Sequence, residues 1–455
     1  MANINKGFKG KKGQVTIFII LGILLLLATA IIVYLNVIGE GTTIKEQIPQ
    51  EEKLPGELDS VRVAVKKCLH ETTKDGLEEL GMQAGWVSTR DEKLAGREFN
   101  FVPDDTNSDG MAMKNLQVPY WTFMDDDNYC QKDCMFGFQR PPLKSSENEG
   151  DKRPDDDTSI EAQLDRYIKK EMPACLDEAY ENFRPRFEIQ EKSPLKPTTV
   201  VTPKEVLVKL DYIVQVSDSS VKAEVKGAYT RIDLPLKKIY ELARGISEAE
   251  SEYRFIERNI MNMITVYSGV DRDKLPPISA TRTDVGSMVV WSETEVKNKV
   301  KQEILVPFVQ GMQVPGTLNY RKTEYNQSGS TLDRMAQGMI ASFSSRIVNE
   351  SYGEYETNFN YLDSPVYFEV TPSKGEILRP QKMSGDIGGV MGVFVQNYEF
   401  RYDVTFPVLV TIVYPGADEF EDSEYIFQFA VEANIRNNMP FGPGDEIPEL
   451  PETEE

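Results

Sequence analysis

The chain of 455 residues contains a single histidine, His70. Because zinc sites combine several His or Cys ligands, this scarcity excludes a multi-histidine zinc site. Basic residues are also few: 51 Lys and Arg stand against 73 Asp and Glu, for a formal net charge of −22. Nucleic acids attract clustered positive charge, and so we expect no nucleic-acid partner.

Recognisable catalytic motifs are absent as well. The segment GDIGGVMG, from Gly385 to Gly392, is rich in glycine but lacks the Lys and the Ser or Thr that hold phosphate and Mg²⁺ in a P-loop. Acidic side chains are so frequent that the sequence singles out no pair as general acid and base. We therefore predict that the protein is not an enzyme.

Charge is missing altogether between Gln14 and Gly39, a run made mostly of Ile, Leu, Val and Ala. An α-helix rises about 1.5 Å per residue, so roughly 20 apolar residues cross a hydrocarbon core about 30 Å thick. The run is preceded by four lysines, Lys6, Lys9, Lys11 and Lys12. Basic flanks stay in the cytoplasm. We expect a transmembrane helix at 14–39 that contacts membrane lipid, with the C-terminal ectodomain outside the cell.

A cleaved secretory signal is the rival interpretation of this run. The apolar region of such a signal is usually shorter, and no small-x-small cleavage site follows Tyr34. The length of the uncharged run therefore favours a span that is retained.

The segment Lys11-Lys12-Gly13-Gln14-Val15-Thr16-Ile17-Phe18 resembles the class III signal peptide of archaeal pilins and archaellins. This resemblance implies that a prepilin-type peptidase cuts after Gly13 and leaves Gln14 as the new N-terminus, with the apolar helix retained. The sequence departs from the family at Phe18, where many members have Glu at the fifth mature position. More weakly, the opening as far as Trp86 is similar to single-span surface proteins of small-genome archaea.

The rest of the chain shows two kinds of apolar periodicity. Steps of three and four residues predict helices at 57–81, 159–183, 235–268 and 331–348, the second with Ser159 as its N-cap. Alternation predicts antiparallel hairpins at 205–229 and 398–435, and shorter strands at 303–309 and 365–370. In the first hairpin, even positions of the first strand and odd positions of the second, through Tyr229, should be buried. Pro407 indicates an edge or a bulge in the second hairpin.

These elements predict an α+β ectodomain behind one N-terminal transmembrane helix. The chain divides into a basic cytoplasmic segment at 1–13, the membrane helix at 14–39, a stalk at 40–56, a cysteine-containing helical domain with a long irregular insertion at 57–195, one or more α+β domains with two long β-hairpins at 196–439, and a disordered acidic tail at 440–455.

The four cysteines all lie in the first part of the chain. Outside the membrane, an even number of cysteines indicates disulfides, and four allow three pairings. Cys68 and Cys175 lie on the apolar faces of two predicted helices, so packing of those faces predicts a Cys68–Cys175 bridge and leaves Cys130 and Cys134 to close a small loop. Zinc is the rival, but Cys-x3-Cys without a nearby His or a second close pair matches it poorly.

One stretch has the spacing of a calcium ligand set. Asp105, Asn107 and Asp109 place oxygen atoms at positions 1, 3 and 5, and Gly110 stands at position 6, as in the opening of a calcium loop. The twelfth position is Leu116, so the segment is not an EF-hand. Asp, Asn and Gly also form turns without metal. Calcium is the only cofactor that the sequence suggests.

The sequence favours a membrane-anchored surface protein with a structural or adhesive role, which self-associates or contacts other cell-surface proteins. The first alternative is a pilin-like filament subunit that is processed after Gly13. The second is a membrane-tethered hydrolase of glycan or peptide, supported only by the abundance of carboxylates. Asn326 and Asn349 begin N-glycosylation sequons that outside placement would make accessible.

Overall fold

The computed structural model describes residues 54–102, 106–113, 116–130, 132–144, 157–218, 221–283, 288–321, 352–383 and 395–445. Within these ranges, no helix has both the length and the apolarity that crossing a membrane requires. The predicted span at 14–39 and the predicted helix at 331–348 lie outside them.

The fold is α+β, as the sequence predicts. Its helices are α2 (Asp59–Met82), α3 (Glu92–Ala95), α4 (Ile160–Phe183), α5 (Leu236–Tyr253), α6 (Phe255–Tyr267), α7 (Glu293–Lys299) and α8 (Val306–Gly311), with short 3-10 segments at Gly56–Leu58 and Glu421–Ser423. The predicted N-cap of α4 is confirmed, since the Ser159 side chain accepts a hydrogen bond from the Ala162 backbone N–H.

The large sheet of the described chain combines strands from both predicted ectodomain ranges. Its strand order is β1 (Gly110–Met113), β2 (Leu116–Met124), β17 (Tyr425–Arg436), β16 (Arg401–Tyr414) and β10 (Glu356–Asn360), with β3 (Phe136–Phe138) beside β2, β11 (Tyr367–Thr371) beside β16 and β18 (Met439–Pro440) beside β17. All of its pairings are antiparallel except that of β2 with β17. Residues 57–195 and 196–439 therefore pack into one structure, although their bounds as domains stay a prediction.

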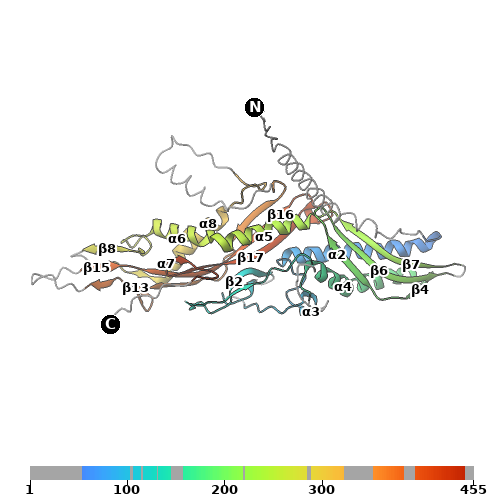
Figure 1. Ribbon diagram of the computed structural model, residues 1–455, viewed down its shortest axis with the longest axis horizontal. Helices are drawn as coiled ribbons and strands as arrows, with labels where there is room; N and C mark the ends of the chain where they lie inside the picture. Colours follow the sequence, from blue (N-terminus) through green and yellow to red (C-terminus); the bar gives the residue numbers. More distant parts are fainter. Residues whose placement is uncertain are drawn as a thin grey trace, which may run out of the picture.

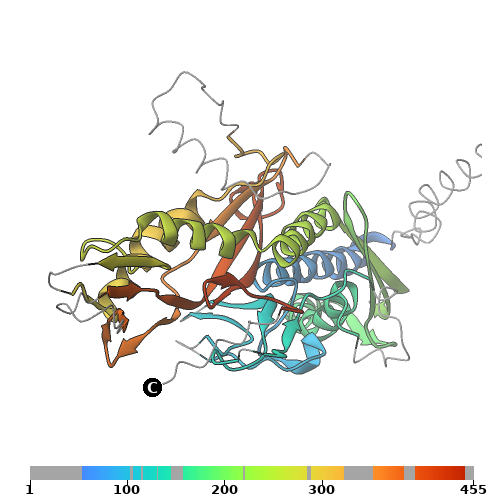
Figure 2. The same cartoon turned by 60° about the vertical axis from the view of Figure 1, so that its left-hand side comes forward.

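Three smaller sheets complete the described fold. One contains β4 (Glu188–Glu191), β5 (Lys196–Val201), β6 (Val206–Ser217) and β7 (Lys222–Ile232); the others are β8 (Ala280–Thr283) with β14 (Gln381–Met383) and β15 (Val395–Tyr398), and β9 (Trp291–Ser292) with β12 (Ser373–Lys374) and β13 (Ile377–Leu378). Figures 1 and 2 show an elongated molecule, with α2, α4 and the β6–β7 hairpin toward one end and β8, β13 and β15 at the other. The β16–β17 hairpin lies between them.

Helix α2 packs into both hydrophobic cores. Its first half buries Val61, Val65 and Leu69 against α4 and the inner face of β6. Its last turns bury Leu77 and Leu80 in the core of the large sheet. Gly81 permits this second contact, because a Cβ there would stand 2.3 Å from the Ile426 carbonyl oxygen of β17.

The first predicted hairpin is confirmed as β6–β7, but its burial pattern changes part-way. Even positions of β6 are buried throughout, as expected. In β7 the buried positions change from odd, at Val225, to even, from Ala228 onward. The register slips there, since two residues of β6 face Gly227 alone. The expectation that Tyr229 is buried is therefore wrong, because the bulge turns it away from the core.

The second predicted hairpin is confirmed as β16–β17. On one edge of β16, Pro407 stands opposite Glu432 of β17. On the other edge, β16 pairs with β11 up to Thr405 and with β10 from Leu409 onward, so Pro407 lies between these two partner strands. A proline lacks the N–H that a ladder needs, so this gap between two partner strands accommodates it. The position is buried, however, and does not face solvent.

The strand predicted at 303–309 is wrong, because this segment is helical. A π-helical segment, η4 (Val300–Leu305), joins α7 to α8. Over the longer window the buried residues recur at helical steps: Val296, Val300, Ile304, Leu305, Phe308 and Val309. A window of seven residues is too short to separate the two periods.

Two further boundaries differ from the prediction. The helix expected at 235–268 is split, because Arg254 adopts φ +46 between α5 and α6. The guanidinium of Arg254 then binds the Pro443 carbonyl and the Asp445 carboxylate. Residues 440–445 are consequently ordered, with Phe441 buried, so the prediction of a disordered tail is wrong for these residues. Residues 446–455 lie outside the described part of the chain.

Both predicted disulfides are confirmed, and no free cysteine remains. Cys68–Cys175 joins α2 to α4 across 107 residues of sequence, whereas Cys130–Cys134 spans 4. In the chain-entropy model, a longer loop gives more stabilisation because it restricts the unfolded chain more.

We therefore expect Cys68→Ala/Cys175→Ala to lower the free energy of unfolding by about 4 kcal/mol, and Cys130→Ala/Cys134→Ala by about 2 kcal/mol. Urea unfolding of the full chain and of both double variants measures this difference. Equal losses in the two variants would contradict the loop-length explanation.

Candidate functional site

The predicted site residues fall into three groups: the cysteines, residues that lie outside the described part of the chain, and two residues of the calcium pattern. The structure brings the cysteines together as expected. Gly13, Gln14, Asp105, Asn326 and Asn349 lie outside the described residues, so processing, glycosylation and the first calcium ligand stay predictions.

The two remaining residues of the calcium pattern are bound by protein donors. The Asn128 side-chain amide donates to Thr106 Oγ1, at 2.7 Å, and to Asn107 Oδ1, at 3.1 Å. Asp109 Oδ2 accepts the Asn100 backbone N–H at 2.8 Å. Among the described residues, no group of three or more His, Cys, Asp and Glu side chains is arranged to hold a metal ion. The Asn128 amide thus donates a hydrogen bond to Asn107 Oδ1, an oxygen that the pattern assigned to calcium.

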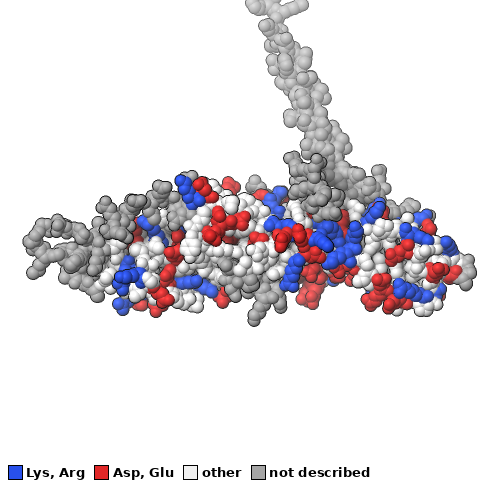
Figure 3. Space-filling model, turned by 90° about the horizontal axis from the view of Figure 1, so that it is seen from below, with Lys and Arg blue, Asp and Glu red and all other residues white. Residues whose placement is uncertain are grey.

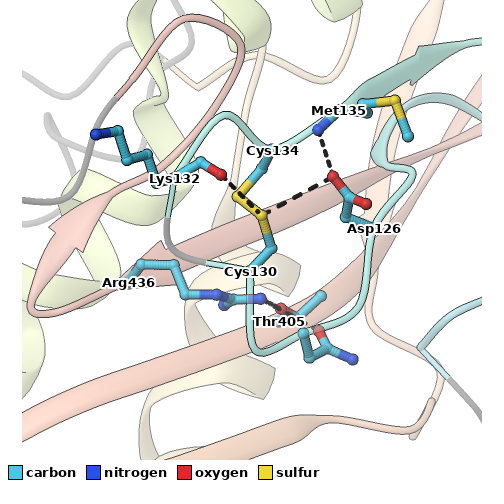
Figure 4. Close-up of a disulfide and its surroundings, with 8 residues drawn as sticks. Asp126, Cys130, Lys132, Cys134, Met135, Thr405 and Arg436 are labelled. Carbon is cyan, nitrogen blue, oxygen red and sulfur yellow. Dashed lines mark hydrogen bonds between the residues drawn. A yellow bond between two sulfur atoms is a disulfide. The ribbon is translucent and has the colours of Figure 1, made fainter.

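Asn128 also connects this loop to the large sheet through a buried arginine. Arg436 Nη2 donates to Asn128 Oδ1 at 3.2 Å and to Thr405 Oγ1 at 2.8 Å, and Nη1 donates to the Ile435 carbonyl at 2.9 Å. Figure 4 shows the Arg436 guanidinium directed at Thr405, with the Cys130–Cys134 disulfide in the same view. A buried guanidinium needs such acceptors, since its charge cannot be given up. Arg436 therefore holds the disulfide loop against β16 and β17.

Three acidic side chains meet nearby in the interior. Glu250 of α5, Glu257 of α6 and Glu432 of β17 line a cavity of about 30 Å³ together with Arg254. Burial raises the pKa of Glu432 to about 7, with Glu257 adding to the rise and Arg436 opposing it. Burial and the charge of Glu257 raise the pKa of Glu250 well above its usual range. The cavity has room for about one water molecule and is too small for a substrate.

Two large clefts adjoin each other beside the end of α2. One has a volume of about 520 Å³ and is bounded by α2, α3, α4 and the start of β2; the other, of about 480 Å³, is bounded by the segment 97–101. Both clefts are lined by Thr89, Arg90 and Gln117. We name the two clefts together the polar groove. Ligand pockets in proteins commonly have about 300–1,000 Å³.

A hydrogen-bonded row of polar side chains runs along the groove where the clefts meet. Gln83 Oε1 accepts from both the backbone N–H and the hydroxyl of Thr89, each at 3.0 Å. Gln117 Oε1 is 3.1 Å from Thr89 Oγ1 and accepts from Arg90 Nε at 3.2 Å. The amide nitrogen of Gln117 has no hydrogen-bond partner among the described residues. Hydrogen bonds to the side-chain oxygens thus hold the row in place, while the Gln117 amide N–H remains available to a ligand.

Aromatic rings form the wall of the second cleft. Phe99 meets Trp86 edge-on with ring centroids 5.0 Å apart and stacks on Phe101 at 5.9 Å. The Arg97 guanidinium lies 4.7 Å from the Phe99 ring centroid and 5.7 Å from that of Trp86. Trp86 is buried, and its indole N–H donates to the Gln139 carbonyl. These contacts fix the half-buried rings of Phe99 and Phe101 at the groove.

Charge along the groove is balanced in sign. Its basic residues are Arg90, Arg97 and Lys170, and its acidic residues are Glu79, Glu92, Glu98 and Glu171. Lys170 is itself paired with Asp91 at 3.0 Å, and this hydrogen bond lowers the pKa of Asp91. Figure 3 shows the same mixture of both signs over one face of the molecule. The groove therefore suits a polar ligand without a large net charge.

Sequence reasoning missed this groove for a definite reason. Its lining comes from α2, α3, α4, β2 and an irregular segment, and no two of these are joined by a spacing motif. The one available signal was the cluster Trp86, Phe99 and Phe101 in a stretch with little periodicity. Asn128 and Arg436 were missed as well, because they are 308 residues apart in sequence.

Comparisons with protein-family models, with curated proteins and with solved structures found no match for this chain. The residues and their geometry are therefore the basis of the functional argument.

The contacts of Asn128 generate a stability prediction. Asn128→Ala removes one acceptor of buried Arg436 and the donor to Thr106 and Asn107, and should lower the free energy of unfolding by about 3 kcal/mol. Asn182→Ala is the matched control, because this exposed asparagine of α4 only bonds the Glu178 carbonyl and should change stability by less than about 0.5 kcal/mol. Urea unfolding measures both, and equal effects would contradict the role of Asn128.

The raised pKa of Glu432 generates a pH prediction. Its folded-state pKa of about 7 exceeds the ordinary 4.5, so between these values the folded state retains a proton that the unfolded state has released. Stability attributable to Glu432 should therefore fall by about 3 kcal/mol as pH rises from about 5 to about 7, and stay constant above.

Glu432→Gln should remove this contribution and make the melting temperature fall less steeply between pH 5 and pH 8. The glutamine oxygen can still accept the Met124 and Asn434 hydrogen bonds. Glu188→Gln on exposed β4 is the control and should retain the original profile. Superimposable profiles for Glu432→Gln and the unchanged chain would refute the assignment.

Proposed function

We propose that this chain is a membrane-anchored surface protein with a structural or adhesive role, held by residues 14–39 and facing outward with its folded part. The observation that best supports the proposal is the pairing of all four cysteines in two disulfides. Disulfides persist in oxidising environments and are rare in the cytosol. This agrees with the topology that the basic flank and the uncharged run predict.

The shape and surface of the described chain support an interaction role over catalysis. The molecule is elongated and has a polar groove of two clefts, whereas its buried carboxyl cluster encloses only about 30 Å³. A hydrolase needs its acid and base within reach of substrate. The buried carboxyl cluster therefore gives no support to the tethered hydrolase.

The experiment that tests the proposal is protease treatment of intact cells that produce the full chain. We expect loss of the region after Gly56 and survival of a membrane-bound N-terminal fragment. Permeabilised cells serve as the control for cleavage, and a cytoplasmic marker protein reports on intactness. Full protection of the region after Gly56, while another surface protein is digested, would refute the outward placement.

The pilin-like alternative is favoured by the Lys12-Gly13-Gln14 segment at the start of the uncharged run. It differs from an isolated anchor in two outcomes of the same preparation. A filament subunit would have Gln14 as its first residue in peptide mass spectra and would form helical particles under the electron microscope. An uncut chain that remains in the membrane fraction supports the anchor.

A further inference from the structure

The polar groove has the features of a site for a chain-like ligand. Its two clefts, of about 520 and 480 Å³, meet along the shared residues Thr89, Arg90 and Gln117. Each cleft is of the size that ligand pockets have. Because the two clefts lie side by side, the groove as a whole is longer than either cleft. A ligand of several linked units fits such a site better than a compact one.

The hydrogen-bonding groups along the groove suit hydroxyl groups. Gln117 Oε1 accepts from Arg90 Nε, but the amide nitrogen of Gln117 has no partner among the described residues. Arg90 and Asn100 are exposed at the groove, and none of the hydrogen bonds of the described chain uses the Asn100 side chain. Amide and guanidinium groups offer several directed donors and acceptors at once. A hydroxyl can both donate to and accept from such groups.

The aromatic wall of the second cleft suits the apolar C–H face of a sugar ring. Phe99 and Phe101 are stacked and half-buried, and Arg97 holds the Phe99 ring from its face. The C–H face of a pyranose packs on an aromatic ring, because it is apolar and its hydrogens meet the electron-rich ring face. Rings that are already fixed lose little conformational entropy when a ligand binds.

The charged residues of the groove indicate what net charge its ligand should have. Three basic residues stand against four acidic ones. The whole chain has a net charge of −22, which repels polyanions at a distance. A neutral ligand needs no excess of either charge in the groove and is not repelled by the negative charge of the whole chain.

We propose that the polar groove binds a neutral oligosaccharide, with the Gln117 amide donating to a hydroxyl and the Phe101 ring packing on a sugar face. This inference rests on the proposed surface role, in which the ligand would be a glycan of a neighbouring cell or envelope. The site makes contact by hydrogen bonds and stacking alone, and no covalent step is involved.

The test uses the full chain in a polyoxyethylene detergent, because maltoside and glucoside detergents would themselves be sugar ligands. Isothermal titration with mannohexaose, cellohexaose and hexa-N-acetylchitohexaose, all neutral, should give a Kd below about 1 mM for at least one of them. Gln117→Glu keeps an oxygen that accepts from Arg90 Nε and replaces the amide donor by a second acceptor oxygen, and should weaken binding about tenfold. Phe101→Ala should have an effect of similar size.

Matched controls are Gln190→Ala on exposed β4 and Phe138→Ala on β3, both outside the groove lining. Each should bind as the unchanged chain does, and thermal melting confirms that all variants are folded. Absence of binding to all three sugars, or binding that neither groove variant weakens, would overturn the proposal. Cell-surface protease accessibility is independent of this result, so surface placement without sugar binding refutes only the inference, and binding without surface placement refutes only the proposed function.

Discussion

The fold depends on one helix that serves two hydrophobic cores. Helix α2 buries its first half against α4 and the β6–β7 hairpin and its last turns against β17 of the large sheet. Gly81 allows the close approach to β17, where the Tyr425 hydroxyl also bonds the Leu77 carbonyl at 2.9 Å. The Cys68–Cys175 disulfide then fixes α2 to α4. Because both hydrophobic cores pack on the same helix, a change in α2 affects both of them.

The irregular region between α2 and α4 is ordered by buried polar contacts instead of periodic apolar packing. Asn128 joins the loop at Thr106 and Asn107 to Arg436 of β17, and the Cys130–Cys134 bridge closes the neighbouring turn. These contacts matter because a segment with little periodicity buries little apolar surface to offset its ordering entropy. The segment 97–101, which lines the polar groove, belongs to the same irregular region.

The polar side chains discussed above form two separate groups, the buried acids and the lining of the polar groove. The cluster of Glu250, Glu257 and Glu432 lines a small cavity, and its raised pKa values make the folded state sensitive to pH. The groove is open and balanced in charge, which suits recognition of a polar ligand. A surface protein can thus bind through one part while the other only affects stability.

Periodicity and residue chemistry by themselves determined much of this protein: the α+β class, helices α2 and α4, the two long hairpins and both disulfide pairs. These features depend on local steps along the chain or on apolar faces that must meet. The helical state of 303–309 is visible in the apolar steps only when the window extends back to Val296. Tertiary packing alone decided the parity change at Gly227 and the order of 440–445 around Arg254. It also decided the groove and the Asn128–Arg436 contact, because their residues come from elements that no spacing in the sequence connects.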